Sequence, residues 1–118
     1  MKTVLVVVLT SALILAGPTA CVATPAQKPA WVDTLIATFE AAPVANPPQR
    51  ILRYRYRDEF VYYVPPTCCD RPSVLYDAKG TILCAPDGGI TGRGDGKCAD
   101  FRDRRSEESV IWSDARTR

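Results

Sequence analysis

Four cysteines are the residues of this chain whose type and spacing could do chemistry: Cys68, Cys69, Cys84 and Cys98. A structural zinc site normally spaces its cysteine pairs by two to four residues, and a redox pair has the pattern Cys-x-x-Cys. Here two cysteines are adjacent and two are single, so we favour disulfide bonds over zinc or redox chemistry. A bond between the adjacent pair would close a strained ring. The preferred framework therefore joins Cys68 and Cys69 separately to Cys84 and Cys98, in an undetermined order.

Carboxylates in the glycine-rich segment 87–96 and just after it are the second set of candidate groups. The chain has no histidine, which excludes histidine-based acid–base catalysis and histidine metal ligands. Paired aspartates could in principle hydrolyse a substrate, but this segment has five glycines and predicts no shaped pocket. We therefore expect no enzyme activity and no cofactor. The one cofactor hypothesis left open is calcium at Asp87, Asp95 and Asp100, although their spacing does not match a calcium loop.

The first 20 residues predict a secretory signal peptide. Lys2 precedes an apolar run over residues 4–16, and small residues follow. The run is shorter than the roughly 20 residues of a membrane-spanning helix, and Pro18 would interrupt one. We expect a signal peptide at 1–20, a tether at 21–28 and a single domain at 29–118.

Cys21 is a candidate for lipidation. Thr19-Ala20-Cys21 resembles the end of a bacterial lipoprotein signal, and five cysteines leave one without a disulfide partner. Lipidation would anchor an exported protein to a membrane of the cell envelope. Ordinary cleavage near Ala23 or Ala26, which would give a secreted or periplasmic protein, is the alternative.

The charge balance argues against nucleic acid as a partner. Cleavage before Cys21 removes Lys2 and leaves 14 basic and 13 acidic side chains. A nucleic-acid-binding domain is expected to carry a strong basic excess.

The segment after Pro29 predicts a helix. Trp31, Val32, Leu35, Ile36 and Phe39 fall on one helical face, which we expect to pack on a sheet. Proline suits a first helical turn, and the Pro43 that follows helps to end the helix.

From residue 51 the apolar period changes to two and predicts strands at 51–57 and 60–64. A two-residue connection at Asp58-Glu59 would place Tyr54 opposite Tyr63, Tyr56 opposite Val61 and Arg55 opposite Tyr62. One face would then be apolar core, and on the other guanidinium groups would stack on aromatic rings.

Arg53, Arg55 and Arg57 form a predicted row on the exposed face of the first strand. The row could bind an anionic glycan, a phosphate or an acidic protein. The alternative is a solvated strand face, stabilised by Tyr62 and neighbouring acids.

The C-terminal half predicts a second hairpin, a fixed loop and an edge strand. Strands at 73–76 and 81–84 flank a turn at 77–80 that ends in glycine, as a left-handed position favours. Loop 87–96 lies between Cys84 and Cys98, and disulfides there would fix it. The run Val110-Ile111-Trp112 predicts an edge strand whose tryptophan closes the core.

The segment from Trp31 to Arg116 resembles a family of small exported bacterial proteins known only as a domain of unknown function. The residues that carry the resemblance are Asn46-Pro47-Pro48, Val61-Tyr62-Tyr63-Val64-Pro65, Cys68-Cys69-Asp70, Leu75-Tyr76-Asp77, Cys84-Ala85-Pro86-Asp87-Gly88-Gly89-Ile90-Thr91-Gly92, Gly94-Asp95-Gly96, Asp100-Phe101 and Ile111-Trp112. The resemblance implies an envelope or secreted location and no catalytic residues.

Together these patterns predict an α+β fold, with one N-terminal helix on an antiparallel sheet of four or five strands and a disulfide-fixed glycine-rich loop. We expect a non-enzymatic envelope or secreted protein that binds or scaffolds an unknown protein or glycan. The alternative is a secreted protease inhibitor that presents the loop between Cys84 and Cys98.

Overall fold

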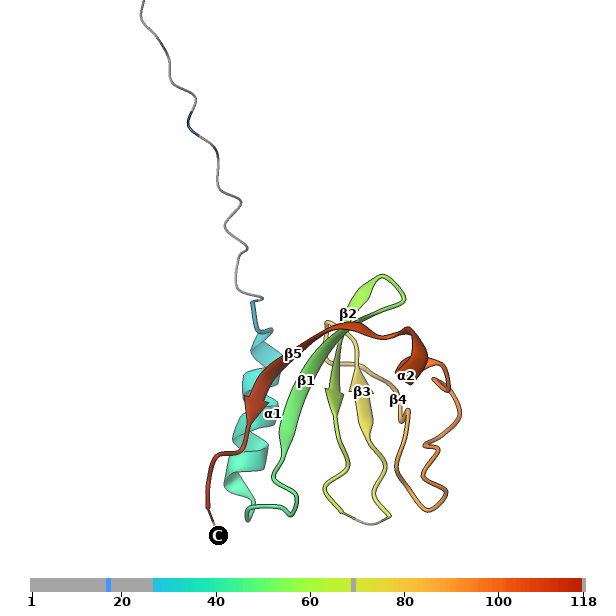
Figure 1. Cartoon of the computed structure of the whole chain (residues 1–118). Helices are drawn as coiled ribbons and strands as arrows, with labels where there is room; N and C mark the ends of the chain where they lie inside the picture. The colour runs from blue at the N-terminus through green and yellow to red at the C-terminus, as the bar shows by residue number, and fades with distance from the viewer. Residues whose placement is uncertain (1–16, 18–26, 69, 118) are drawn as a thin grey trace, which may run out of the picture.

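The computed structural model describes Gly17 and residues 27–68 and 70–117. The elements in chain order are α1 (Ala30–Ala41), β1 (Arg50–Tyr56), β2 (Glu59–Val64), β3 (Val74–Tyr76), β4 (Ile82–Cys84), α2 (Phe101–Arg104) and β5 (Ser106–Ser113). The five strands form one antiparallel sheet in the order β4-β3-β2-β1-β5 (Figure 1). The α+β prediction is confirmed. Cys21, most of the predicted signal peptide and the tether up to residue 26 lie outside the described residues.

Helix α1 forms where the apolar stripe predicted it. Val32 and Ile36 are buried, while Asp33 and Thr34 face solvent. The helix ends at Ala41, where the amide of Ala42 donates to the Phe39 carbonyl at 3.2 Å. No helix in the described part of the chain is long and apolar enough to cross a membrane.

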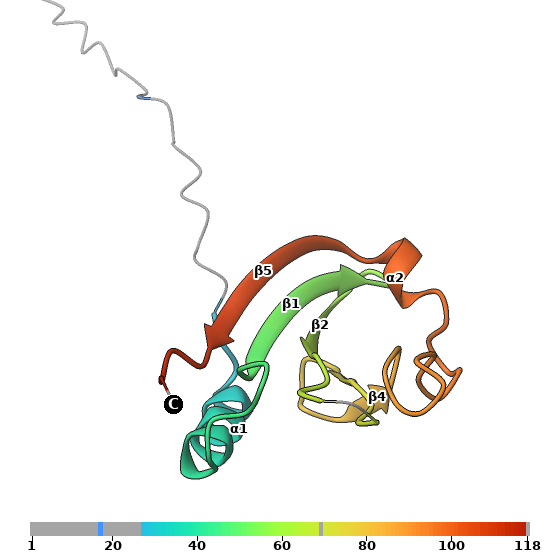
Figure 2. The same ribbon diagram turned by 60° about the horizontal axis from the view of Figure 1, so that its bottom comes forward.

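The buried side chains form two clusters, one on each face of the curved sheet (Figure 2). The cluster on the α1 side contains Val32, Ile36, Ile51, Tyr62 and Val64. The cluster on the opposite face contains Leu52, Tyr54, Tyr56, Val61, Tyr63, Leu75, Cys84, Cys98 and Phe101. Successive strand residues point to opposite faces, so β1 and β2 contribute to both clusters. Burial on both faces explains why β2 is apolar at successive positions, whereas β1 alternates because it carries Arg53 and Arg55 on the α1 side.

The β1–β2 turn lies one residue earlier than predicted. Its central residues are Arg57 and Asp58, both left-handed, with φ of 51° and 63°. Tyr54 therefore pairs with Val61, and Tyr56 with Glu59, so the predicted partners are wrong. Two left-handed residues match the twist of a tight hairpin even without glycine. Each β1 residue therefore pairs with a β2 residue two positions before its predicted partner. Because side chains alternate between the two faces of the sheet, every side chain still lies on its predicted face.

The β3–β4 hairpin is confirmed, with each strand one residue shorter than predicted. Gly80 ends the turn at a φ of 86°. Trp31 of α1 lies against this turn and donates its indole N–H to the Ala78 carbonyl at 3.0 Å. A Cβ on Gly80 would approach Cδ2 of Trp31 to 2.8 Å, so glycine is needed for this close contact as well as for the turn.

Strand β5 is the predicted edge strand, but it begins four residues before the apolar run. It pairs with β1 and is preceded by the short helix α2. Trp112 packs against the cluster on the α1 side and stacks on Phe39, with ring centroids 5.9 Å apart. The prediction that Trp112 closes the core is confirmed.

The preferred disulfide framework is wrong, because Cys84 is bonded to Cys98 with their Cα atoms 6.1 Å apart. Both cysteines belong to the cluster on the face opposite α1. Cys68, in contrast, lines a hollow beside α1; it too is disulfide-bonded, and Cys69 lies outside the described residues. Cys68 therefore joins neither of the two cysteines that were its predicted partners. The Cys84–Cys98 bond joins residues 14 positions apart, and a disulfide that closes a loop of this length stabilises the fold by about 3 kcal/mol.

Candidate functional site

The three aspartates considered for calcium are held apart by separate structural contacts. Asp95 accepts hydrogen bonds from the amides of Ala85 and Lys97, both at 3.0 Å, and the Lys97 amide is the largest cause of its lowered pKa. Asp87 instead accepts the hydroxyl of Tyr63 at 2.8 Å. Within the described ranges, no three His, Cys, Asp or Glu side chains are grouped to hold a metal. The structure therefore does not bring the calcium ligands together.

Asp100, the third of these aspartates, organises the other end of the same face. It accepts the Tyr56 hydroxyl at 2.6 Å and the Arg57 guanidinium at 3.1 Å, and Arg104 lies 3.4 Å away. The Tyr56 hydrogen bond, followed by the charge of Arg57, lowers the pKa of the Asp100 carboxyl. Asp100 is thus ionised at neutral pH and fixes two arginines beside the β1–β2 turn.

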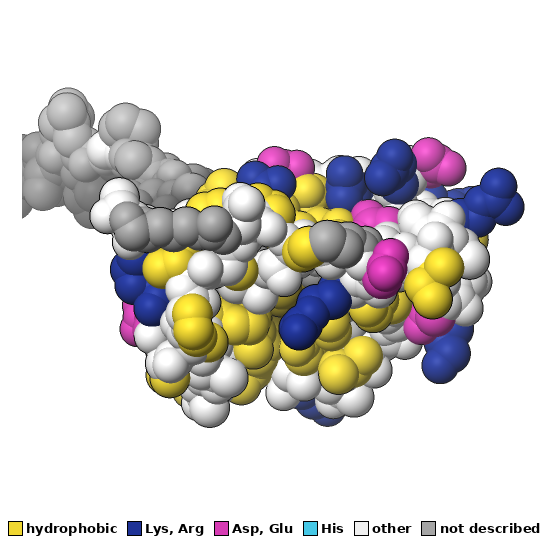
Figure 3. Space-filling view, turned by 90° about the horizontal axis from the view of Figure 1, so that it is seen from below, with side chains coloured by type: hydrophobic (Ala, Val, Ile, Leu, Met, Phe, Trp, Pro, Cys, Tyr) yellow, Lys and Arg dark blue, Asp and Glu magenta, His cyan; other side chains and the backbone are white. Residues whose placement is uncertain are grey.

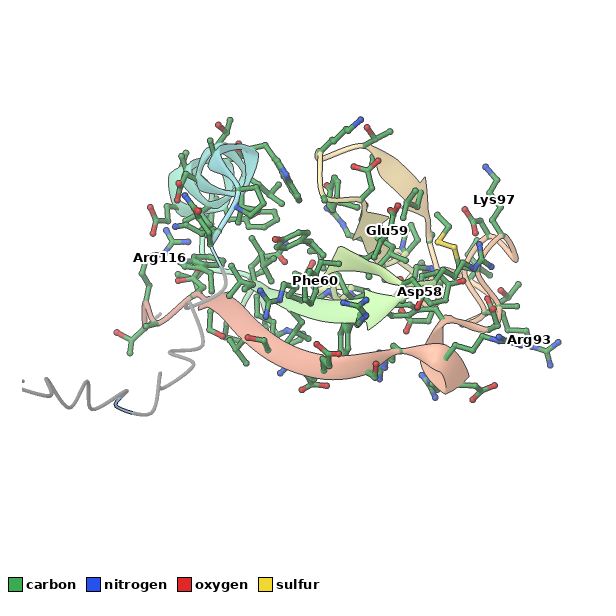
Figure 4. The ribbon with its side chains drawn as sticks, turned by 90° about the horizontal axis from the view of Figure 1, so that it is seen from above. Asp58, Glu59, Phe60, Arg93, Lys97 and Arg116 are labelled. Carbon is green, nitrogen blue, oxygen red and sulfur yellow. A yellow bond between two sulfur atoms is a disulfide. The ribbon has the colours of Figure 1, made fainter. Side chains whose placement is uncertain are left out.

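The predicted row of three arginines divides at this turn. Arg53 and Arg55 stay on one face and stack on Phe60, at 4.4 and 5.5 Å from the ring centroid. Arg57 leaves the row because its left-handed backbone turns the chain, and its guanidinium lies 4.7 Å from the centroid of Tyr56. Stacking on aromatic rings is confirmed, but the ring for the first two arginines is Phe60. Figure 4 labels Phe60 beside Asp58 of the turn and Glu59, the first residue of β2.

Arg55 and Arg57 contribute to a cleft of about 320 Å³ at the turn, which we call the arginine cleft. Its lining residues are Arg55, Tyr56, Arg57, Asp58, Arg104 and Ser106. Arg104 comes from α2, and Ser106 begins β5 directly opposite Arg55. The cleft is therefore built by the β1–β2 hairpin and by the segment that leads into the edge strand.

The arginine cleft carries an excess of positive charge. Asp58 also lines the cleft, and Asp100 neutralises part of the charge of Arg57 and Arg104, so with Arg55 the excess is one positive charge among these five groups. Within the described residues, Arg55 forms no ion pair, and Nε of the neighbouring Arg53 is buried without a hydrogen-bond partner. A guanidinium presents planar donors that match oxyanions, and the Ser106 hydroxyl adds another donor. The arrangement suits binding of an anionic group.

The sequence pointed to Arg55 and Arg57 but not to Arg104 and Ser106. A basic group at residues 102–105 is visible in the sequence, but it is interleaved with acids. Its member Arg104 joins the cleft because α2 is packed through Phe101, which is buried in the same cluster as Tyr56.

The loop between Cys84 and Cys98 exposes one large apolar side chain, Ile90, at 90% of its surface. Gly88, Gly89 and Gly92 on either side of it have left-handed φ angles of 72° to 74°. The loop is folded back on itself, with the Gly94 amide bonded to the Gly88 carbonyl at 3.0 Å. It does not present the extended strand that adds to the edge of a partner's sheet.

The fold and cleft define a small disulfide-bonded α+β domain with an arginine-lined surface site. The chain belongs to the family described as a domain of unknown function, DUF6970, whose model matches residues 37–114. No curated protein and no solved structure matches it. The predicted membership of a family of unknown function is thereby confirmed.

Proposed function

We propose that this protein is a non-enzymatic binding domain of the cell envelope or the secreted space, and that the arginine cleft holds an oxyanion of its ligand. The observation that carries this proposal is that Arg55, Arg57 and Arg104 all line one cleft, and that Arg55 forms no ion pair within the described chain. Three cations on different elements suit the several oxygens of a phosphate or sulfate group better than a single carboxylate. The ligand class is a phosphorylated or sulfated glycan, or a partner protein carrying such a group.

Export is part of the same proposal. The Cys84–Cys98 disulfide supports it, since such bonds persist in oxidising compartments. Anchoring through lipidated Cys21 would place the domain at a membrane. The intact mass of the protein from its native host, before and after reduction, tests both points: an acylated chain that starts at Cys21 is expected, and an intact leader on a fully reduced chain would overturn them.

The cleft is tested by titrating the full-length protein with inorganic phosphate, sulfate and pyrophosphate, using acetate as the weak-binding comparison. Arg55→Gln and Arg104→Gln are expected to weaken pyrophosphate binding about tenfold each, because each removes a charge-assisted contact. Arg93→Gln is the matched control, since Arg93 is exposed on the glycine-rich loop and does not line the cleft.

Affinity should fall as salt rises, as expected for ion pairing at an exposed site. Equal pyrophosphate affinity in the wild type and both cleft variants would rule the cleft out as the site. The protease-inhibitor alternative has no comparable support, because residues beside Ile90 fold back in turns.

A further inference from the structure

Three adjoining hollows lie where the α1–β1 and β2–β3 connections meet. Figure 1 shows these connections at the edge of the molecule opposite the β1–β2 turn. Their volumes are about 400, 330 and 150 Å³, and Gln49 lines all three. Figure 3 views this edge and shows hydrophobic side chains around a hollowed surface. We call the three hollows together the proline groove.

Proline residues make up much of the wall of the proline groove. Six of the ten prolines of the chain line it: Pro43, Pro47, Pro48, Pro65, Pro66 and Pro72. Phe39, Val64 and Tyr76 add apolar surface in the smallest hollow. Proline has a fixed φ, so little conformational entropy is lost when a ligand settles against such walls. The groove is preorganised for an apolar ligand.

Gln49 places an unsatisfied acceptor in this apolar setting. Its side-chain oxygen Oε1 is buried and has no hydrogen-bond partner. The main chain of Gln49 is fixed, since its carbonyl accepts the Asp114 amide at 2.8 Å. A buried acceptor without a partner is unfavourable, and a donor supplied by a ligand would satisfy it. A backbone N–H of an extended peptide is such a donor.

The charges of the proline groove are all of one sign. Arg50 lines the largest hollow, and Arg71 lines the other two. Neither arginine forms an ion pair with any part of the chain that the structure describes. The residues lining the three hollows include no Asp or Glu. An acidic ligand is therefore complementary to the groove.

We propose that the proline groove binds an extended peptide segment of a partner protein in which apolar side chains are flanked by Asp or Glu. The apolar side chains pack against the prolines, and the acids pair with Arg71 and Arg50. One peptide N–H donates to Oε1 of Gln49 once the Gln49 side chain rotates this oxygen from its buried position into the groove. This site is separate from the arginine cleft and does not depend on it.

The proposal is tested by selecting binders for the purified full-length protein from a random short-peptide library and measuring the enriched peptide by fluorescence anisotropy. Enrichment of acidic residues beside apolar ones is expected. Arg71→Gln should weaken binding about tenfold, as expected for loss of a charge-assisted contact. Gln49→Leu should weaken it about fivefold without lowering the melting temperature, because it removes an unsatisfied buried group and keeps a similar volume.

Arg93→Gln is the matched control and should leave peptide affinity unchanged. The proposal is overturned by a selection that enriches no peptide, or by an enriched peptide that binds Arg71→Gln and Gln49→Leu as tightly as the wild type. Loss of peptide binding in Arg55→Gln alone would also overturn it, since the peptide would then occupy the arginine cleft. Pyrophosphate affinity in the groove variants should equal that of the wild type, so the two proposals fail separately.

Discussion

Gly94 is a residue at which the backbone leaves no room for a side chain. Its φ is 66°, and an added Cβ would lie 1.8 Å from the Ala85 carbonyl oxygen. Gly92 has a similar φ of 72° but has open space around its Cβ position. Comparing substitutions at these two glycines therefore distinguishes the effect of a left-handed backbone from the effect of close packing.

We predict that Gly94→Ala lowers the free energy of unfolding by about 3 kcal/mol, because the strain of a left-handed alanine adds to a backbone clash. Gly92→Ala should cost only about 1 kcal/mol, from the left-handed backbone alone. Urea denaturation of both variants checks this. Equal losses would show that the loop shifts to absorb the Gly94 clash.

Arg116 completes the C-terminal end of α1, which has no basic residue of its own in its last turn. Its guanidinium donates to the carbonyls of Phe39, Glu40 and Ala42 at 2.8 to 3.1 Å. It also makes two hydrogen bonds to the carboxylate of Asp114, whose side chain is only 2% exposed. One side chain thus ties the C-terminal segment to the helix.

We predict that Arg116→Gln lowers the melting temperature by about 5 °C, because it uncaps α1 and leaves the Asp114 carboxylate without its cation. The control is Arg102→Gln, since Arg102 is 76% exposed and only 4.0 Å from Asp87. That variant should melt as the wild type does. Differential scanning calorimetry measures both.

The Asp114–Arg116 ion pair predicts that the stability of the fold depends on pH in the acid range. Arg116 lowers the pKa of Asp114 below its usual 3.8, so the pair stabilises the fold at pH values above 3.8. This stability is lost as the pH falls through the lowered pKa. The difference in melting temperature between wild type and Arg116→Gln should therefore shrink below pH 3.8, and a constant difference would contradict this account.

At the scale of elements, Trp31 is one of the side chains that attach α1 to the sheet. Trp31 packs edge-on against Tyr62 and tilted against Tyr76, each with ring centroids 5.2 Å apart, and bonds the Ala78 carbonyl. The first turn of the helix is thereby joined to strands β2 and β3 and to the β3–β4 turn.

We predict that Trp31→Ala costs about 3 kcal/mol of unfolding free energy, because a large aromatic contact and a hydrogen bond are lost together. In the Trp31→Ala variant, hydrogen exchange should be accelerated, relative to the wild type, more at the amides of α1 than at those of β1. Thr34→Ala on the exposed side of the same helix should change stability by less than about 0.5 kcal/mol. Hydrogen exchange that is equally accelerated in every element would argue that α1 does not open separately.

At the scale of the whole molecule, the two sheet faces bury every tyrosine of the chain at least in part. Burial is the largest cause of a raised pKa for all five, namely Tyr54, Tyr56, Tyr62, Tyr63 and Tyr76. Burial and a hydrogen bond to Glu108 raise the pKa of Tyr54 to about 12. The raised pKa values therefore reflect both hydrophobic clusters.

We predict that tyrosinate absorbance stays low in the native protein at pH 10, where free tyrosine is half ionised. A raised pKa stabilises the fold below the unfolded value of 10.0 and loses this contribution as the pH rises through the folded value. Unfolding and tyrosine ionisation should thus occur together in an alkaline titration. Ionisation of one tyrosine near pH 10 with the circular dichroism spectrum unchanged would contradict this for that residue.

The molecule as a whole has its two proposed sites at opposite ends of the sheet. The arginine cleft lies at the β1–β2 turn, and the proline groove lies where β1 begins and β2 ends. This separation would let one small domain hold an anionic ligand and a peptide at the same time, as a scaffold does.

The sequence by itself determined the features that depend on local period and turn chemistry. These are the helix at 30–41, the alternation in β1, the 77–80 turn and the edge strand that contains Trp112. Each reflects neighbours a few residues apart, whose side-chain directions follow from the backbone alone.

Only the tertiary structure decided the Cys84–Cys98 pairing, the Arg57-Asp58 turn, the addition of Arg104 to the arginine cleft and the meeting of Gln49 with Pro65. Each of the contacts depends on which sheet face or edge a distant segment packs against. At the turn, Arg57 donates to Asp100, which is 43 residues away in the sequence. A linear pattern does not contain such packing, because many segments compete for the same apolar surface and their total burial selects the arrangement.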